Sequence, residues 1–316
     1  MQKLSVILII SIAFLVSWSS EVMADTDTSQ KSLLVTGAST GIGRHLAETL
    51  AAAGHHVYAG ARKDTDLAAL NAIKNITAVR LDVTKQNEID AVVNLIKQKG
   101  TGLYALVNNA GIGGGGPVLE TPIEHQTLLY NVNVEGVYRI TKAFAPLIIE
   151  SKGRIATTGS IAGTLSWAGS SAYSGSKHWV EALTDALAAE METYGVSVSV
   201  IEPGNYQSFI RRSSVLSSHA RIKEAGGEIT PEMQANFDAT KARELSYKLP
   251  DEVSEAYMHA LFNEKPLRRY MVVPSAEEQA MTITTKIQQL IQLNQWGPYT
   301  YSNKELVKMI TDAMAK

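Results

Sequence analysis

Two residues four positions apart, Tyr173 and Lys177, could work together as an acid–base pair. The surrounding pattern predicts a helix, and side chains with this spacing lie on the same helix face. An ammonium group about 5 Å from a phenol favours the phenolate by about 3 kcal/mol at an effective dielectric constant of about 20. We therefore expect Lys177 to lower the pKa of Tyr173, so that the phenol can act as a general acid or base.

The same spacing occurs at Tyr138 and Lys142, so spacing alone does not select the pair. Ser160 favours the pair at Tyr173 and Lys177, because it follows the strand predicted over Arg154–Thr158. It therefore lies at the carboxyl edge, where open α/β sheets bind ligands. The helix that carries Tyr173 begins close to this edge, whereas no polar strand end directly precedes Tyr138. We interpret Tyr138 as a packed helical aromatic beside a solvated lysine.

A glycine-rich turn at residues 36–43 predicts a dinucleotide site. It reads Thr-Gly-Ala-Ser-Thr-Gly-Ile-Gly and separates a predicted strand, Ser32–Thr36, from a predicted helix, Gly43–Ala53. Gly37, Gly41 and Gly43 permit positive φ angles and leave room for a pyrophosphate at the helix N-terminus. A strand, a glycine turn and a helix in this order are what such a site requires.

Two other interpretations of this turn stay open. It also fits G-x-S-x-G, the nucleophile elbow of α/β-hydrolases, with Ser39 as the nucleophile. That elbow normally follows several strands, and only His219 and His259 could supply the late histidine of a triad. The second interpretation is a tight turn that binds no ligand.

Strand and helix patterns alternate along most of the chain, which predicts βαβ crossovers and a parallel sheet. The predicted strands are Ser32–Thr36, His56–Ala59, Ala78–Leu81, Leu103–Val107, Arg154–Thr158, Val196–Ile201 and Arg269–Val273. The clearest helices are Gly43–Ala53, Gln86–Lys99, Val134–Glu150 and Ala172–Tyr194. No linker divides the chain, so we expect one doubly wound α/β domain over residues 25–316. A polar insertion at residues 205–249 predicts a lid or binding loop.

The composition excludes several classes of function. The 316 residues are 45% hydrophobic and 19% charged, which is typical of a folded globular chain. With 29 basic against 31 acidic residues, the chain lacks the electrostatic signature of nucleic-acid binding. The absence of cysteine excludes disulfides and thiol catalysis, and His45, His55 and His56 lack metal-ligand spacing, so we expect no metal.

The first 24 residues predict a secretory signal peptide. Lys3 precedes an apolar run, Leu4–Trp18, and Ala24 ends a small-residue cleavage site. As a helix this run would span about 22 Å, less than the roughly 30 Å of a hydrocarbon core. We therefore expect export to a periplasm or secretory lumen. An uncleaved membrane anchor is the alternative, and an apolar first element of the fold is a further one.

Five motifs occur in the order and spacing of the short-chain dehydrogenases/reductases, which the chain resembles over residues 31–204. They are Thr36-Gly-x-x-x-Gly-x-Gly43, Asn108-Asn-Ala-Gly111, Ser160, Tyr173-x-x-x-Lys177 and Pro203-Gly204. The C-terminal third is less similar, although Arg268-Arg-Tyr270 resembles the last strand of steroid- and retinol-type members. The resemblance implies a Rossmann-type fold and hydride transfer between a nicotinamide cofactor and an alcohol, ketone or aldehyde.

The resemblance also implies roles for individual residues. Tyr173 would exchange a proton with the substrate oxygen, and Ser160 would hydrogen-bond the same oxygen. Lys177 would lower the pKa of Tyr173 and bind the nicotinamide ribose. The backbone carbonyl of Asn133 would hold a proton-relay water, with Asn131 as the competing choice. The cofactor would contact Gly37, Ser39, Gly41, Ile42, Gly43, Asp82, Val83, Asn109, Ala110, Gly111, Pro203 and Gly204.

The end of the second predicted strand favours NADP(H) over NAD(H). An NAD site usually places a carboxylate there for the ribose 2′-hydroxyl, but this chain has Arg62, whose paired donors suit a 2′-phosphate. Asp64 and Asp66 lie nearby, but they fit the start of a helix. NAD(H) is the alternative cofactor. Asp82 fits a helix cap as well as an adenine contact. An NADP(H) cofactor conflicts with export, because its chemistry is normally intracellular.

Apolar residues near the predicted site suggest a lipophilic substrate. Leu165 and Trp167 lie between Ser160 and Tyr173, and the insertion carries Tyr206, Phe209 and Ile210. We expect a lipophilic alcohol or ketone, with a small ketone left open. By family analogy we also expect a homodimer or homotetramer. The alternatives to an oxidoreductase are a non-catalytic dinucleotide-binding protein and the Ser39 hydrolase.

Overall fold

The computed structural model describes residues 30–315 and confirms the predicted doubly wound α/β fold. Seven parallel strands form one sheet in the order β3-β2-β1-β4-β5-β6-β7. They are β1 (Ser32–Val35), β2 (His56–Ala61), β3 (Ile76–Arg80), β4 (Ala105–Asn108), β5 (Arg154–Thr158), β6 (Ser197–Pro203) and β7 (Arg269–Val272). The strand order reverses between β1 and β4, and this reversal opens a crevice at their carboxyl ends. The predicted signal peptide, residues 1–24, lies outside the described residues.

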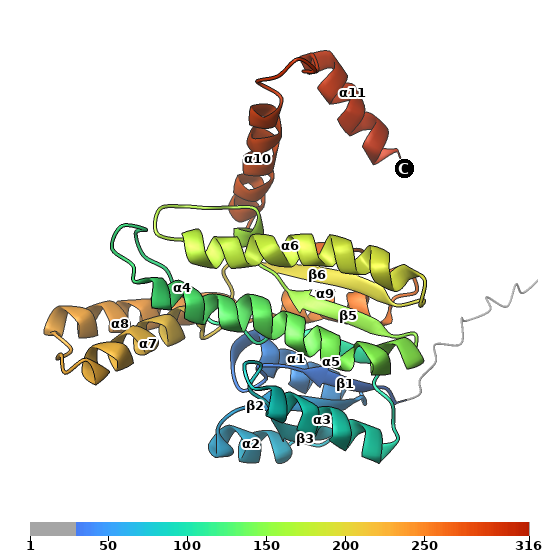
Figure 1. Ribbon diagram of the computed structural model, residues 1–316, viewed down its shortest axis with the longest axis vertical. Helices are drawn as coiled ribbons and strands as arrows, with labels where there is room; N and C mark the ends of the chain where they lie inside the picture. The colour runs from blue at the N-terminus through green and yellow to red at the C-terminus, as the bar shows by residue number, and fades with distance from the viewer. Residues whose placement is uncertain (1–29, 316) are drawn as a thin grey trace, which may run out of the picture.

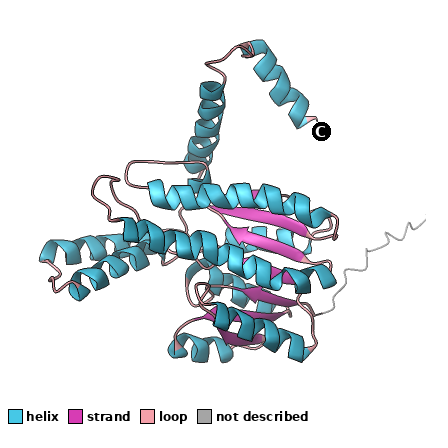
Figure 2. Cartoon of the chain, viewed as in Figure 1, coloured by secondary structure: helices cyan, strands magenta, loops and turns pink. Residues whose placement is uncertain are grey.

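Helices cover both faces of the sheet (Figure 1 and Figure 2). One face carries α1 (Gly41–Ala52) and α9 (Asp251–Phe262), and the other carries α3 (Gln86–Lys99), α5 (Val137–Glu150) and α6 (Ser171–Glu192). Side chains alternate along a strand, so β1 contributes to both cores. Leu33 and Val35 pack in the cluster that includes α1 and α9, whereas Leu34 packs in the cluster that includes α3 and α5. Because both faces are covered, the central strands are buried along their whole length.

Two shorter helices complete the connections near the crevice. They are α2 (Asp64–Asn71), between β2 and β3, and α4 (Ile123–Tyr130). A π-helical segment, Asn131–Gly136, joins α4 to α5, so the helical region begins well before the predicted start at residue 134. π-helical turns inside helices are frequent at functional sites, and this one contains Asn133.

The polar insertion folds as two helices, α7 (Ile210–Glu224) and α8 (Pro231–Leu245), which project from the carboxyl edge of the sheet (Figure 1). The fully buried side chain of Glu244 ties them together. Its carboxylate accepts a hydrogen bond from the backbone N–H of Arg211 and forms an ion pair with Arg212. The buried carboxylate therefore fixes the start of α7 against the end of α8.

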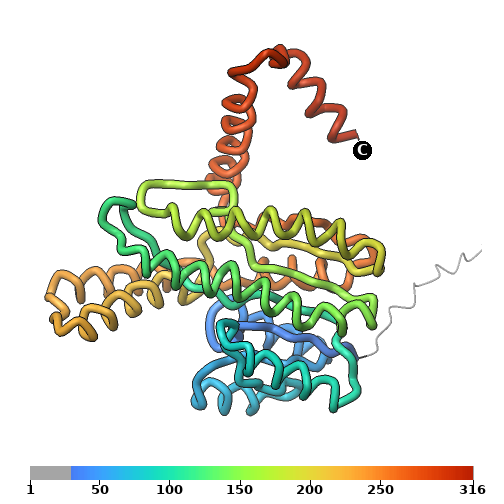
Figure 3. Tube along the Cα trace, viewed as in Figure 1, coloured from blue at the N-terminus to red at the C-terminus, as the bar shows by residue number. Residues whose placement is uncertain are grey.

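The chain ends in two helices that extend away from the sheet, α10 (Ala276–Leu293) and α11 (Asn303–Met314) (Figure 3). Gln289 of α10 donates a hydrogen bond of 3.1 Å to the Thr164 carbonyl, and Ser302 starts α11 with a capping box. Over residues 30–315, none of the helices combines the length and hydropathy needed to cross a bilayer.

Candidate active site

The crevice between β1 and β4 continues into a cleft of about 390 Å³ that runs along the carboxyl edge of the sheet. Every residue predicted to contact the cofactor lines this cleft. These residues are Gly37, Ser39, Gly41, Ile42, Gly43, Arg62, Asp82, Val83, Asn109, Ala110, Gly111, Tyr173, Lys177, Pro203 and Gly204. Ser160 lines it too, so residues that are distant in the sequence meet at one site.

The glycine turn has the backbone conformation that its sequence predicts. The φ angles are +65° at Gly37 and +58° at Gly41, which a residue with a side chain rarely adopts. At Gly43 the constraint is contact: a Cβ atom would lie 2.2 Å from the Asn109 Nδ2 atom and 2.5 Å from the Gly37 carbonyl oxygen. The turn therefore presents bare backbone at the N-terminus of α1, which fits a pyrophosphate.

A hydrogen-bond network joins the ends of β1, β4 and β5. The Asn109 side chain donates to the backbone carbonyls of Thr36 (3.0 Å) and Gly37 (3.2 Å). Its Oδ1 atom accepts from the Thr158 hydroxyl at 3.1 Å, and that hydroxyl also bonds the buried phenol of Tyr257. Asn109 is thus a structural bridge across the cleft floor as well as a lining residue.

Ser160, Tyr173 and Lys177 converge at the inner end of the cleft. The Ser160 hydroxyl faces the Tyr173 phenol closely enough to act on its pKa, and the Lys177 ammonium lies 5.8 Å from the centre of the Tyr173 ring. Lys177 is buried and donates a hydrogen bond of 2.8 Å to the Thr158 carbonyl oxygen. The strand β5 therefore positions both Ser160 and the lysine, and the first turn of α6 supplies the phenol.

The expected effect of Lys177 on the Tyr173 phenol is not what the structure gives. Burial raises the pKa of Tyr173, while the hydrogen bond from Ser160 and the charge of Arg211 act in the opposite direction. Burial also lowers the pKa of Lys177 to about 8, against the charge of Glu181. The reason is that both groups lie in a low-dielectric site, where desolvation disfavours each charged form. The ammonium also faces the ring and the Thr158 carbonyl.

Asn133 is fully enclosed, and its side chain connects three segments. Its Oδ1 atom accepts from the Ile112 backbone N–H at 2.9 Å, and its Nδ2 group donates to the Ile112 carbonyl (3.0 Å) and the Ser176 hydroxyl (3.2 Å). The side chain therefore fixes the loop after β4 against α6, next to Lys177. The carbonyl of the competing residue, Asn131, accepts a hydrogen bond from Arg139.

The adenosine end of the cleft carries charges of both signs. Arg62 and Lys63 follow β2, and Asp66 of α2 also lines the cleft. Asp82 accepts hydrogen bonds from the backbone and hydroxyl of Thr84, so it has the local capping role as well as a place in the cleft wall. Although burial raises the pKa of Asp82, these hydrogen bonds and the charge of Arg62 outweigh it and leave that pKa lowered.

A second pocket, of about 610 Å³, adjoins the site on the other side of Tyr173. Trp167 and Ile210 line it as expected, but Leu165 and Tyr206 do not. Leu165 is buried, and Tyr206 lies in the core next to α9, where its hydroxyl bonds Glu252. The prediction failed for these two residues because an apolar side chain near a site can as easily face the core. Phe209 lines the cofactor cleft instead.

The competing residues lie elsewhere. Tyr138 is 55% exposed, so it is a surface residue of α5 and not the packed aromatic that we expected; Lys142 is exposed as expected. His219 contacts Phe237, and His259 hydrogen-bonds Tyr270. No histidine contact to Ser39 occurs within residues 30–315. In the same range, no cluster of histidine and acidic residues could hold a metal ion.

Two kinds of site residue could not be predicted from the sequence. The Thr158 carbonyl anchors Lys177, yet a backbone acceptor leaves no mark in a sequence. Arg211 and Arg243 line the second pocket, and only the packing of α7 against α8 brings them there. Ser208, which lies close after Pro203-Gly204 and carries a hydroxyl, also lines the cofactor cleft.

The sheet order, the glycine turn and the convergent Ser-Tyr-Lys set define a dinucleotide-binding oxidoreductase. Residues 31–217 match the family described as short chain dehydrogenase. D-beta-hydroxybutyrate dehydrogenase, mitochondrial, of Bos taurus is 34% identical over 264 residues, which cover 76% of both chains. The 3beta-hydroxysteroid dehydrogenase dhs-16 of Caenorhabditis elegans is 31% identical over 268 residues, covering 77% of this chain and 69% of that relative.

The fold is also similar to that of solved short-chain dehydrogenases. A short-chain dehydrogenase from Streptomyces avermitilis has a TM-score of 0.69 and 29% sequence identity, covering 85% of this chain and 97% of its own. The chain therefore belongs to the short-chain dehydrogenase family and is an NAD(P)-dependent oxidoreductase that acts on CH–OH groups.

Proposed function

We propose that the protein interconverts a secondary alcohol and a ketone by hydride transfer with NADP(H), with Tyr173 as the general acid and base. The observation that carries this proposal is the convergence of Ser160, Tyr173 and Lys177 where the cofactor cleft meets the second pocket. A nicotinamide bound in the cleft supplies or accepts the hydride. In reduction, the Tyr173 phenol gives its proton to the carbonyl oxygen, which Ser160 also hydrogen-bonds.

The raised pKa of Tyr173 suits the role of proton donor, because the phenol stays protonated until the substrate oxygen develops charge. Lys177 is cationic below a pKa of about 8 and lies against the ring. Although burial dominates the pKa of the resting phenol, we propose that this charge stabilises the phenolate as it forms. Asn133, which fixes the neighbouring loop, is proposed to hold the relay water that returns the proton to Tyr173.

The preference for NADP(H) is supported by the cations that follow β2. Arg62 and Lys63 line the cleft there, and Arg62 is 66% exposed, so its guanidinium can reach a 2′-phosphate. The substrates named for the two relatives, a hydroxybutyrate and a 3beta-hydroxysteroid, are both secondary alcohols. They support the reaction class but differ in polarity and size.

The two Tyr-x-x-x-Lys pairs provide a matched test. NADPH oxidation at 340 nm is followed with a panel of ketones for the wild type, Tyr173→Phe and Tyr138→Phe, and the alcohol product is quantified. We expect Tyr173→Phe to lose at least about a hundredfold in kcat and Tyr138→Phe to keep wild-type turnover. Unchanged turnover in Tyr173→Phe would refute the assignment. Esterase activity that disappears in Ser39→Ala would favour the hydrolase instead.

A further inference from the structure

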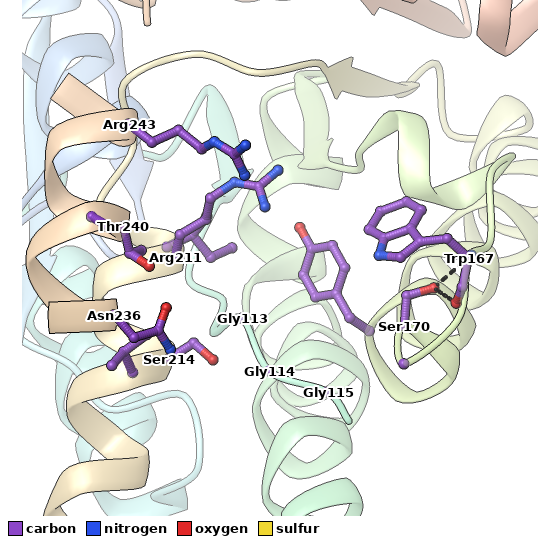
Figure 4. Close-up of a pocket in the computed structure, with 15 residues that line it drawn as sticks. Gly113, Gly114, Gly115, Trp167, Ser170, Arg211, Ser214, Asn236, Thr240 and Arg243 are labelled. Atoms are coloured by element: carbon purple, nitrogen blue, oxygen red, sulfur yellow. Dashed lines mark hydrogen bonds between the residues drawn. The ribbon is translucent and has the colours of Figure 1, made fainter. Parts of the chain in front are cut away.

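The pocket on the substrate side of Tyr173 contains two cationic side chains and no carboxylate. Arg211 of α7 and Arg243 of α8 both line it, together with the small polar residues Ser214 and Thr240. Both arginines extend from the α7–α8 side into the pocket, opposite the wall that carries Trp167 and Ser170 (Figure 4). The pocket wall therefore has a formal charge of +2 beside the reacting phenol.

The internal pairing of the α7–α8 insertion leaves these two arginines available. The buried carboxylate of Glu244, whose other contact is the backbone N–H of Arg211, forms its ion pair with Arg212. Arg211 donates to the neutral Asn205 Oδ1 atom at 2.8 Å, a bond that orients its guanidinium without cancelling its charge. Within residues 30–315, neither Arg211 nor Arg243 forms an ion pair with an acidic side chain.

Neither arginine is placed to serve the cofactor. The dinucleotide cleft is lined by Phe209, Ile210 and Ser213 of the same segment but by neither Arg211 nor Arg243. The charge of Arg211 nevertheless acts on the Tyr173 phenol, which places it within electrostatic reach of the reacting atoms. An anionic group bound by these two arginines would therefore belong to the substrate and not to the cofactor. It would lie on the side of the Tyr173 phenol away from the nicotinamide site.

We propose that the enzyme acts on hydroxy and oxo acids, and that Arg211 and Arg243 bind the substrate carboxylate while Tyr173 acts on its alcohol or ketone group. This proposal rests on the proposed hydride transfer. The remaining walls, formed by Trp167, Ile210 and Val215, are apolar, and the volume of about 610 Å³ exceeds what a few carbon atoms fill. The substrate class is therefore an acid with an apolar body. During reduction the carbonyl carbon gains the hydride, its oxygen gains the Tyr173 proton, and the carboxylate is unchanged.

The test compares oxo acids of increasing chain length with their methyl esters, using kcat/KM at low ionic strength. Arg211→Gln and Arg243→Gln remove one charge each, and Lys241→Gln removes an exposed charge on α8 outside the pocket as the control. A hydrogen bond to a charged group changes affinity by about tenfold to a hundredfold, and the exposure of both arginines favours the lower end. We expect the wild type to prefer acids about tenfold or more, and each arginine variant to lower the acid-to-ester ratio about tenfold.

A wild-type ratio near one, or a ratio that neither arginine variant changes, overturns the inference. If esters are still reduced through Tyr173 in that case, the proposed function stands and only the substrate class fails. Binding provides a readout that does not need turnover: calorimetry with hexanoate and hexanamide on the enzyme–NADP⁺ complex. We expect hexanoate alone to bind and to weaken in Arg243→Gln, and equal binding of both compounds contradicts the proposal.

Discussion

Replacing Arg62 by Gln should weaken the binding of NADPH and leave the binding of NADH unchanged. Arg62 follows β2, lines the cofactor cleft and is paired with Asp82 only at 4.0 Å, which is too long for a hydrogen bond. Its donors can therefore turn to a 2′-phosphate, which NADH lacks. The variant tests the proposed cofactor preference without touching the reacting groups.

The size of the effect follows from the exposure of this side chain. A hydrogen bond between charged groups contributes about 1.5–3 kcal/mol, and solvent screens an arginine that is 66% exposed. The lower end, about 1.5–2 kcal/mol, corresponds to a rise of roughly tenfold to thirtyfold in the Kd for NADPH. The difference between wild type and variant should shrink as salt is added.

Both dinucleotides are titrated into the wild type, Arg62→Gln and Lys74→Gln, with tryptophan fluorescence as the readout. Lys74 is an exposed cation outside the cleft, so its variant controls for net charge. If NADH binds the wild type as tightly as NADPH, or if Arg62→Gln weakens both dinucleotides equally, the role given to Arg62 is wrong.

Two further predictions concern stability and the glycine turn. Burial and the nearby Glu181 raise the pKa of Glu202 from 4.5 to about 7, so between these values the folded chain holds a proton that the unfolded chain has lost. The free energy of unfolding should therefore fall as pH rises through this window. Measured by urea denaturation, Glu202→Gln should raise the free energy of unfolding by up to about 3 kcal/mol at pH 8 and leave it unchanged at pH 4. Equal effects of the substitution at both pH values would contradict this. Gly43→Ala should cost about 1–3 kcal/mol and weaken NADPH and NADH alike, because its Cβ would lie 2.2 Å from Asn109; a variant with normal stability and affinity would refute the contact argument.

The sequence predicted the sheet and the cofactor cleft well for a physical reason. β-branched segments and glycine turns are local signals, and strand order then brings their ends together, as with Gly37 and Asn109. Whether a side chain is buried depends on the packing of the whole fold and not on the local sequence. The raised pKa of Tyr173 depends on the low-dielectric surroundings, and the core position of Leu165 depends on packing that no spacing reveals.

The insertion shows the same limit. Its polar sequence predicted a lid or binding loop, but only the packing of α7 against α8, where Glu244 pairs with Arg212, places Arg211 and Arg243 in the pocket. Export through residues 1–24, the choice between NADP(H) and NAD(H), and a homodimer or homotetramer stay predictions. N-terminal sequencing of the mature chain tests whether residues 1–24 are removed, as the predicted signal peptide requires.

The central claim is that Ser160 and Tyr173 act on the same substrate oxygen, and a double-mutant cycle tests it most directly. Hydride transfer is measured in single turnovers, with saturating NADPH, for Ser160→Ala, Tyr173→Phe and the variant that carries both changes. Groups that act as a unit are strongly non-additive, so the double variant should be hardly slower than Tyr173→Phe alone. Rate losses that multiply fully in the double variant would show that the two side chains act independently and would contradict the claim.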